Sequence, residues 1–182
     1  IDANRIDAKK LTDLFADFIE DVAQQCQKPH DFAPFHKQLR SPKDYLKFGI
    51  DFMRPLIDFE RSKTIIDEEA KDIGERLKRG ENVIFFANHQ IEADPQVLFS
   101  LIGDLQWPLK TIFVAGERVV LDPLAIPFSL GCNLLCIYSK KHIDNPPEKR
   151  QEKLRHNQKT MGQMRSLLEK GSTSIWVAPS GG

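Results

Sequence analysis

The sequence of 182 residues has few cysteines and no excess of either charge. Its 3 cysteines (Cys26, Cys132 and Cys136) are odd in number and lack CxxC spacing, so neither a disulfide framework nor a zinc site is indicated. The 26 basic and 26 acidic residues give a net charge of zero, which removes bulk electrostatic attraction to nucleic acid as an explanation of function. The 5 histidines form no paired-ligand pattern, and we expect no metal.

The sequence also lacks a hydrophobic run long enough to cross a membrane. The longest uncharged stretch, residues 123–139, falls short of the ~20 apolar residues that a transmembrane helix needs. It is interrupted by Pro127, Gly131 and Asn133. No signal or transit sequence is visible in the first residues, which carry many acids. We therefore expect no transmembrane segment and a reducing compartment, while peripheral membrane contact stays open.

Several common catalytic motifs are missing as well. The sequence contains no GxSxG nucleophile motif and neither of the glycine-rich phosphate loops, GxxxxGK[ST] and GxGxxG. Neither Cys132 nor Cys136 has a histidine at a recognisable spacing. Covalent catalysis by serine or cysteine is therefore not indicated, and the two cysteines are expected to line a strand and its approach.

The first third of the chain carries helical patterns. Apolar residues recur at three- and four-residue spacing over residues 11–22, which indicates an amphipathic helix that ends before Pro29. Ser41, followed by Pro42, predicts the N-cap of a second helix, which ends or kinks near Pro55. These segments resemble part of a helical bundle.

After Gly80 the pattern changes to short apolar runs that alternate with helical segments. Residues 83–87 are continuously apolar, which is typical of a strand buried on both faces of a parallel sheet. The predicted strands cover residues 83–87, 111–115, 133–138 and 174–178. The predicted helices cover residues 67–79, 95–102, 123–130 and 147–170. The alternation predicts an α/β domain over residues 65–182, with a mixed, mostly parallel sheet flanked by helices, preceded by a partial N-terminal helical region over residues 1–64.

The most informative short motif is NHQIEADP at residues 88–95. His89 follows the first predicted strand, at the sheet edge where open α/β sheets place their ligands. Asp94 before Pro95 predicts the N-cap of the next helix. If the connection is tight, the Asp94 carboxylate turns towards the His89 imidazole, fixes its tautomer and leaves the other nitrogen as a general base. The alternative, an ordinary helix cap and a loop histidine, is equally compatible with the spacing.

Two further groups of cations follow predicted strands. Lys140, Lys141 and His142 come after the third strand, at the same edge as His89 if the strands are parallel, where they suit a phosphate or carboxylate. The alternative is a solvated turn. Arg118 follows the second strand and is either another cation at this edge or the partner of a neighbouring carboxylate, Glu117 or Asp122.

The segment 140–170 holds nine basic and four acidic residues, a local excess of five positive charges in a neutral chain. Such a segment suits an acidic partner or an anionic substrate, although a long solvated helix would have the same composition. Its expected apolar stripe is narrow, consisting of Leu154, Met161, Met164 and Leu168. Four cations are then expected to face solvent: Lys149, Arg150, Lys153 and Lys159.

The blocks NHQIEADP, TIFVAGERVVLDPLAIPFSLGCNLLCIYSKKH and IWVAPSGG closely resemble the soluble, plastid-type glycerol-3-phosphate acyltransferases. The preceding stretch DFMRPLIDFE is similar to the same family. The resemblance extends from about Ser41 to Gly182. It implies an N-terminal helical bundle, an α/β catalytic domain, and transfer of a fatty acyl group to the sn-1 hydroxyl of glycerol 3-phosphate. Acyl-acyl carrier protein or acyl-CoA would be the donor, with no further cofactor.

The resemblance also implies roles for individual residues. His89 and Asp94 fall on the family's HxxxxD catalytic pair, and Lys141 and His142 fall on its phosphate-binding positions. The final block normally continues into an arginine-containing turn that holds phosphate, so we expect a C-terminal portion of the catalytic domain beyond Gly182. Bacterial cytoplasm and plastid stroma both stay open as locations.

Three points are left open by the sequence. The oxyanion of the transfer reaction needs donors, and backbone amides near Gly181 and Gly182 or at the start of the Pro95 helix are candidates. A non-catalytic α/β module that binds an anionic metabolite or a protein would keep the basic segment and need no proton transfer by His89. A hydrolase would need a nucleophile or a metal site that the sequence does not show.

Overall fold

The computed structural model describes residues 7–63, 65 and 68–179. Its centre is a sheet of five strands in the order β1-β4-β3-β5-β2. The strands are β1 (Phe35–His36), β2 (Val83–Phe86), β3 (Ile112–Ala115), β4 (Asn133–Cys136) and β5 (Ser174–Val177). Strands β2 to β5 run parallel, and β1 pairs antiparallel with β4. The predicted α/β class with a mixed, mostly parallel sheet is confirmed.

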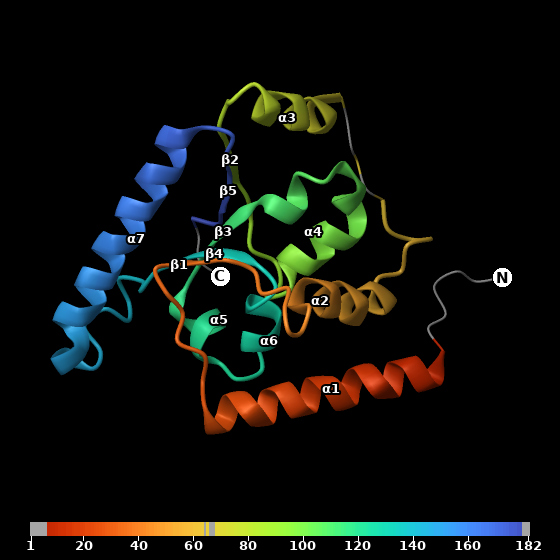
Figure 1. Cartoon of the computed structure of the whole chain (residues 1–182), viewed down its shortest axis with the longest axis horizontal. Helices are drawn as coiled ribbons and strands as arrows, with labels where there is room; N and C mark the ends of the chain where they lie inside the picture. Colours follow the sequence, from red (N-terminus) through yellow and green to blue (C-terminus); the bar gives the residue numbers. More distant parts are fainter. Residues whose placement is uncertain (1–6, 64, 66–67, 180–182) are drawn as a thin grey trace.

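Helices lie on both sides of this sheet (Figure 1). They are α1 (Ala8–Gln27), α2 (Tyr45–Met53), α3 (Glu68–Lys78), α4 (Asp94–Ile102), α5 (Glu117–Leu121), α6 (Ile126–Ser129) and α7 (Arg150–Lys170). Short 3-10 turns are η1 (Arg54–Leu56), η2 (Gly103–Leu105), η3 (Pro108–Lys110) and η4 (Pro147–Lys149). Among the described helices, none is both long and apolar enough to cross a membrane.

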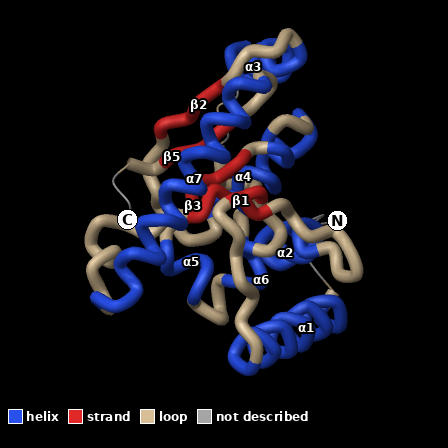
Figure 2. The backbone as a smooth tube through the Cα atoms, turned by 60° about the vertical axis from the view of Figure 1, so that its left-hand side comes forward, coloured by secondary structure: helices blue, strands red, loops and turns tan. Residues whose placement is uncertain are grey.

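The larger core lies between the sheet and the helices α2, α4 and α6, and its centre is formed by Ile126, Leu130 and Leu134, each at most 3% exposed. Of the helices that the structure describes, only α7 packs on the opposite face, with Met164, Leu167 and Leu168 against a smaller cluster in strands β3, β4 and β5. Figure 2 shows α7 lying across one side of the strands while α2 and α6 lie on the other. The result is a three-layer α/β/α arrangement.

The strand β2 differs from its prediction. It occupies an edge of the sheet, and Ile84 and Phe86 are 45% and 76% exposed. These residues pair in register with Ile175 and Val177 of β5, whose side chains belong to the cluster under α7. Because α7 packs on the inner strands, the same face of β2 is left uncovered. The expectation that this run is buried on both faces was therefore wrong.

The N-terminal residues pack directly on the α/β layers. The predicted first helix is confirmed as α1, whose Phe18 ring lies 5.2 Å from Phe52 of α2 and 5.5 Å from Phe128 of α6. In the sequence, strand β1 comes between α1 and α2. It was not predicted, because two residues are too short for a periodic pattern. Its His36 is 6% exposed, and burial lowers the pKa of this imidazole.

The start of the second helix was predicted wrongly. Helix α2 begins at Tyr45, and its N-cap is Asp44, whose carboxylate accepts a hydrogen bond from the Lys47 amide at 3.0 Å. The same carboxylate binds Arg40 at 2.7 Å. Asp44 therefore satisfies a free amide of the first turn, and Ser41 lies outside the helix.

The turn before β5 explains why β5 lies beside β2. Gly171 has φ 73° and approaches the Gly80 carbonyl so closely that a Cβ would collide with its oxygen. The Ser172 amide donates to this carbonyl at 3.1 Å. Glycine is required at position 171 both for the positive φ and for the close approach, and this contact brings the ends of α3 and α7 together.

Candidate active site

The strand-to-helix connection after β2 brings His89 and Asp94 together, as predicted. The Nδ1 atom of His89 lies 2.7 Å from Oδ2 of Asp94, and the two side chains are 30% and 18% exposed. Because a carboxylate oxygen accepts hydrogen bonds, Nδ1 carries the proton and Nε2 keeps its lone pair. In the neutral ring, Nε2 is therefore the nitrogen that can accept a proton from a ligand.

The segment between β2 and α4, residues 87–93, is here called the His89 loop. Asp94 holds this loop by accepting hydrogen bonds from the amides of Gln90 at 3.0 Å and Ile91 at 3.2 Å. The predicted N-cap role is thus modified, because these hydrogen bonds reach back into the loop and Asp94 is itself the first residue of α4. One carboxylate orients the imidazole and fixes the backbone beside it.

The Nε2 side of His89 faces a second carboxylate. Oε2 of Glu92 lies 3.7 Å from Nε2, and Oε1 of Glu92 lies 3.6 Å from the Arg118 guanidinium. Arg118 is therefore paired with a carboxylate of the His89 loop, and neither Glu117 nor Asp122 is its ion-pair partner. Its side chain is 79% exposed, so an exposed cation and His89 share the Glu92 carboxylate as a neighbour.

The segment between β4 and η4, residues 137–146, is here called the Lys141 loop. It leaves the carboxyl end of β4, and because β2 and β4 run parallel, it emerges at the same edge of the sheet as the His89 loop. Strands β5 and β3 lie between the two. Lys140, Lys141 and His142 are all exposed, so the predicted cations are available to a ligand at this edge.

The Lys141 loop is tied to helix α7 by Lys153, a residue that the sequence placed on the solvent face. Lys153 is 5% exposed. Its ammonium donates to the carbonyls of His142 at 2.8 Å and Asn145 at 2.7 Å, and to Oε1 of Glu117 at 3.2 Å. The expected apolar stripe was also partly wrong, since Met161 is 56% exposed.

The buried cysteines do not supply a nucleophile. Burial raises the pKa of both Cys132 and Cys136 to about 12, so each is a neutral thiol at physiological pH. Cys132 accepts a hydrogen bond from the Gln96 amide at 3.5 Å. The expectation that these residues line a strand and its approach is confirmed.

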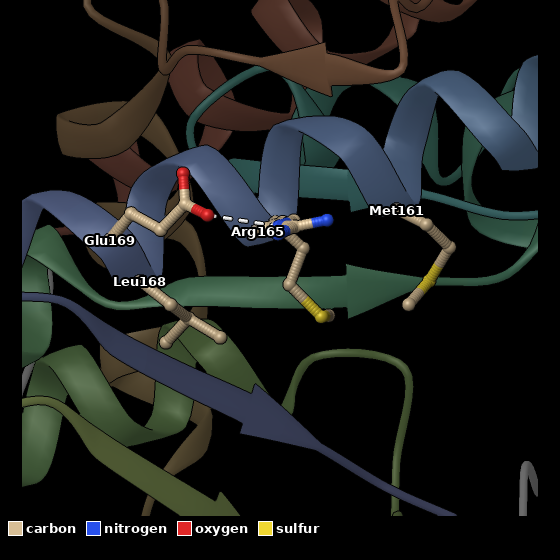
Figure 3. A pocket seen from close by; sticks show the side chains of 5 residues that line it. Met161, Arg165, Leu168 and Glu169 are labelled. Atoms are coloured by element: carbon tan, nitrogen blue, oxygen red, sulfur yellow. Dashed lines mark hydrogen bonds and ion pairs between the residues drawn. The ribbon is translucent and has the colours of Figure 1, made fainter.

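A shallow hollow on α7 is unrelated to the predicted site (Figure 3). Its lining consists of Met161, Met164, Arg165, Leu168 and Glu169, all from this one helix. The charges of Arg165 and Glu169 are paired with each other at 2.9 Å. Within the described residues, no group of three or more potential metal ligands gathers at one place. The candidates Gly181 and Gly182 lie outside the described residues.

Comparison with known proteins agrees with this geometry. Residues 70–182, which include both loops, match the acyltransferase family. The chain belongs to the acyltransferase family. The family resemblance identified from the NHQIEADP and SKKH blocks is thereby confirmed, and the His89–Asp94 pair lies within the matched segment.

Similar proteins carry a more specific name. The chain is 44% identical over 163 residues to the chloroplastic glycerol-3-phosphate acyltransferase of Spinacia oleracea, an alignment that covers 88% of this chain and 34% of that protein. It is 41% identical over 183 residues to the chloroplastic glycerol-3-phosphate acyltransferase of Pisum sativum, covering 99% of this chain and 39% of that protein. The chain thus spans between a third and two fifths of the length of these curated relatives.

Proposed function

We propose that the protein containing this chain transfers a fatty acyl group from an acyl thioester to the sn-1 hydroxyl of glycerol 3-phosphate. The observation that carries the proposal is the His89–Asp94 hydrogen bond of 2.7 Å, within a chain of the acyltransferase family. The names of the similar proteins support glycerol 3-phosphate as the acceptor. Their chloroplastic names also support a plastid location, and we propose the stroma.

In this reaction Nε2 of His89 accepts the hydroxyl proton while the oxygen attacks the thioester carbonyl. The negative charge that develops on the carbonyl oxygen needs nearby donors, and backbone amides near Gly181 and Gly182 remain our candidates. Collapse of the tetrahedral intermediate breaks the carbon–sulfur bond, and His89 returns its proton to the leaving thiolate. Asp94 stabilises the imidazolium and keeps Nδ1 protonated throughout.

The phosphate of the acceptor is proposed to bind Lys141 and His142, with Arg118 as a further cation near His89. The Lys141 loop presents exposed cations at the sheet edge that also carries His89, which supports this assignment. A phosphate between the loops would position the sn-1 hydroxyl of the same small molecule near Nε2. The charges of Lys141 and Arg118 also discriminate glycerol 3-phosphate from uncharged glycerol.

The donor is proposed to be acyl-acyl carrier protein or acyl-CoA, approaching over the start of α7. Lys149 and Arg150 are exposed there, although Arg150 is paired with Asp144 at 2.6 Å. Lys153 is buried and is therefore not part of this surface. Charge reversal at Lys149 and Arg150 should raise the KM for a carrier-bound donor and flatten its salt dependence, because acyl carrier proteins are acidic.

The proposal is tested with the intact protein, acyl-CoA and glycerol 3-phosphate, by following formation of 1-acyl-glycerol 3-phosphate. The wild type should form this product, and Lys141→Ala should raise the KM for glycerol 3-phosphate about tenfold with little effect on the KM for the donor. Release of free fatty acid without the product would indicate a hydrolase. Binding of glycerol 3-phosphate without any turnover would indicate a binding module.

A further inference from the structure

Helix α7 carries a polar stripe that faces the protein and not the solvent. Lys153, His156, Asn157 and Thr160 lie at positions i, i+3, i+4 and i+7, so they share one face of the helix. Lys153 and Thr160 are buried, and the whole stripe hydrogen-bonds with the backbone that leads from β4 into the Lys141 loop. Sequence periodicity alone suggested a solvated helix here.

The contacts follow this backbone step by step. Thr160 donates to the Cys136 carbonyl at 2.7 Å, where β4 ends. Asn157 accepts from the Tyr138 amide at 2.8 Å and donates to the Tyr138 carbonyl at 2.9 Å. Since the chain has left the sheet at this point, these side chains replace the missing strand partners of its backbone groups.

Lys153 completes the series at the loop itself. An ammonium has three donors, and Lys153 has three oxygen acceptors within 3.2 Å: the carbonyls of His142 and Asn145 and the carboxylate of Glu117. Glu117 is the first residue after Gly116, which follows β3. The Lys153 side chain therefore connects the segment that follows β3 with the Lys141 loop that follows β4. Both segments carry cations of this sheet edge, Arg118 in the first and Lys141 in the second.

The position of Lys153 is costly for stability. It lies in the first turn of α7, where the helix dipole disfavours a cation. Its side chain is 6% exposed and that of Glu117 is 19% exposed, and burying an ion pair costs desolvation that the attraction barely offsets. Oε2 of Glu117 is buried without a hydrogen-bond partner among the described residues. Stability alone does not explain a charge at this place.

The geometry points to Lys153 as a positioning residue for phosphate binding. Because its ammonium draws the carbonyls of His142 and Asn145 inward, it fixes the curvature of the Lys141 loop and leaves the side chains of Lys141 and His142 in solvent. Lys153 does not contact the phosphate; it acts through the loop. This inference rests on the proposed function, in which that loop binds glycerol 3-phosphate.

The test is made in the intact protein with the variant Lys153→Met, which removes the charge and keeps an unbranched side chain. The KM for glycerol 3-phosphate should rise about tenfold, since even a small displacement of a binding group has effects of this order or larger. The KM for acyl-CoA should change less than about twofold. Lys170→Met, at the exposed far end of the same helix, serves as the control and should behave as wild type.

The double variant Lys141→Ala/Lys153→Met separates positioning from general destabilisation. If Lys153 acts through the loop, adding Lys153→Met to Lys141→Ala should raise the KM for glycerol 3-phosphate by clearly less than it does in the wild type, because only His142 is left to be displaced. Amide hydrogen exchange over residues 139–146 should also be faster in Lys153→Met. Additive effects, or an unchanged KM in the folded single variant, would overturn the inference.

Two further controls keep the outcomes distinct. If Lys153→Met does not fold, Lys153→Gln replaces it, because its amide can donate to one of the two carbonyls and so support folding. One carbonyl is still released and the KM for glycerol 3-phosphate should still rise, so an unchanged KM in that variant overturns the inference. If Lys141→Ala itself leaves the KM for glycerol 3-phosphate unchanged, the proposed phosphate site is wrong, and the inference falls with it. A raised KM in Lys141→Ala with a normal KM in Lys153→Met rejects the positioning role alone.

Discussion

The His89 loop and the Lys141 loop leave the same edge of the sheet but are held in different ways. The His89 loop is held from within, because Asp94 binds His89 and the amides of Gln90 and Ile91, all within six residues. The Lys141 loop has turn hydrogen bonds of its own, from the His142 and Ile143 amides to the Ser139 carbonyl, and it is held in addition from outside by Lys153 and Asn157 of a helix that follows it. The first loop is therefore ordered mainly by its own carboxylate, whereas the position of the second also depends on where α7 packs.

This difference matches the proposed tasks of the two loops. Proton transfer requires a fixed angle between the imidazole and its carboxylate, which a short loop with its own carboxylate provides. Phosphate binding requires cations that remain in solvent while their backbone is fixed. A buried ammonium on a separate helix achieves this, because it turns the carbonyls inward without occupying the exposed face.

The largest effect is expected from removing the base itself. His89→Ala should lower kcat by about 10²–10⁴-fold, the usual contribution of a general base. The fold should be retained, because His89 is 30% exposed and Asp94 keeps its two backbone hydrogen bonds. Steady-state kinetics and thermal unfolding of the intact protein check both statements. Near wild-type kcat in the folded variant would exclude His89 as the base.

The next largest effect is expected from Asp94, the carboxylate of the His89 loop that orients the base. In Asp94→Asn the new amide can donate to Nδ1, which moves the imidazole proton to Nε2 and blocks proton acceptance. We expect kcat to fall by about 10²-fold or more, with the KM for glycerol 3-phosphate little changed. Asp104→Asn, an exposed carboxylate just after the same helix, is the matched control. Equal kcat values for the two variants would contradict the dyad.

A smaller effect is expected from the helix contact at the base of the Lys141 loop. Asn157→Ala removes both hydrogen bonds to Tyr138, so the loop should lose part of its support. The KM for glycerol 3-phosphate should rise about threefold while kcat stays close to wild type, since one or two hydrogen bonds of ordinary strength are lost. The exposed neighbour Gln158→Ala is the control. A loss of kcat instead would show that the two loops are coupled.

A still smaller effect is expected from Arg118, the exposed cation that pairs with the His89 loop through Glu92. Its exposed pair with Glu92 contributes little to stability, so Arg118→Ala should leave thermal unfolding unchanged. If it assists phosphate binding as proposed, the KM for glycerol 3-phosphate should rise by about twofold to threefold, and less at high salt. An unchanged KM across a salt series would leave Arg118 as a partner of Glu92 only.

The smallest effect lies outside both loops and concerns pH. Burial lowers the pKa of His36 below its ordinary value of 6.5, so the native state binds this proton less readily than the unfolded chain. Stability from His36 is therefore complete above about pH 6.5 and is lost as the pH falls towards the native pKa. Thermal unfolding at a series of pH values should show a decrease in Tm that is weaker in His36→Asn. Identical pH profiles would show that His36 makes no contribution.

Much of the fold followed from local patterns. Four of the five strands and the helices α1, α4 and α7 lie close to their predicted ranges, because apolar periodicity and the residues that end helices act over a few neighbouring positions. The His89–Asp94 contact was predictable for the same reason. By contrast, α5 and β1 were missed because each is five residues or shorter, which leaves no period to detect.

Two of the errors share one physical origin. Residues 83–87 look like an interior strand, but β2 lies at the edge because no described strand covers its far side. Lys153 looks like a solvent-facing cation in a polar helix, but it is buried because Glu117 and the Lys141 loop surround its ammonium. In both cases the environment is made by residues distant in the sequence, and a local pattern contains no information about them.

The sequence by itself determined where the strands end, that a carboxylate follows His89 by five residues, and that cations follow β4. Those features depend on backbone propensity and on short loops, so neighbouring residues suffice to specify them. Only the tertiary structure decided that Arg118 pairs with Glu92 and that α7 turns Lys153 inward. Ion pairs and burial are set by which surfaces meet when the sheet and helices pack, and that is a property of the assembled core.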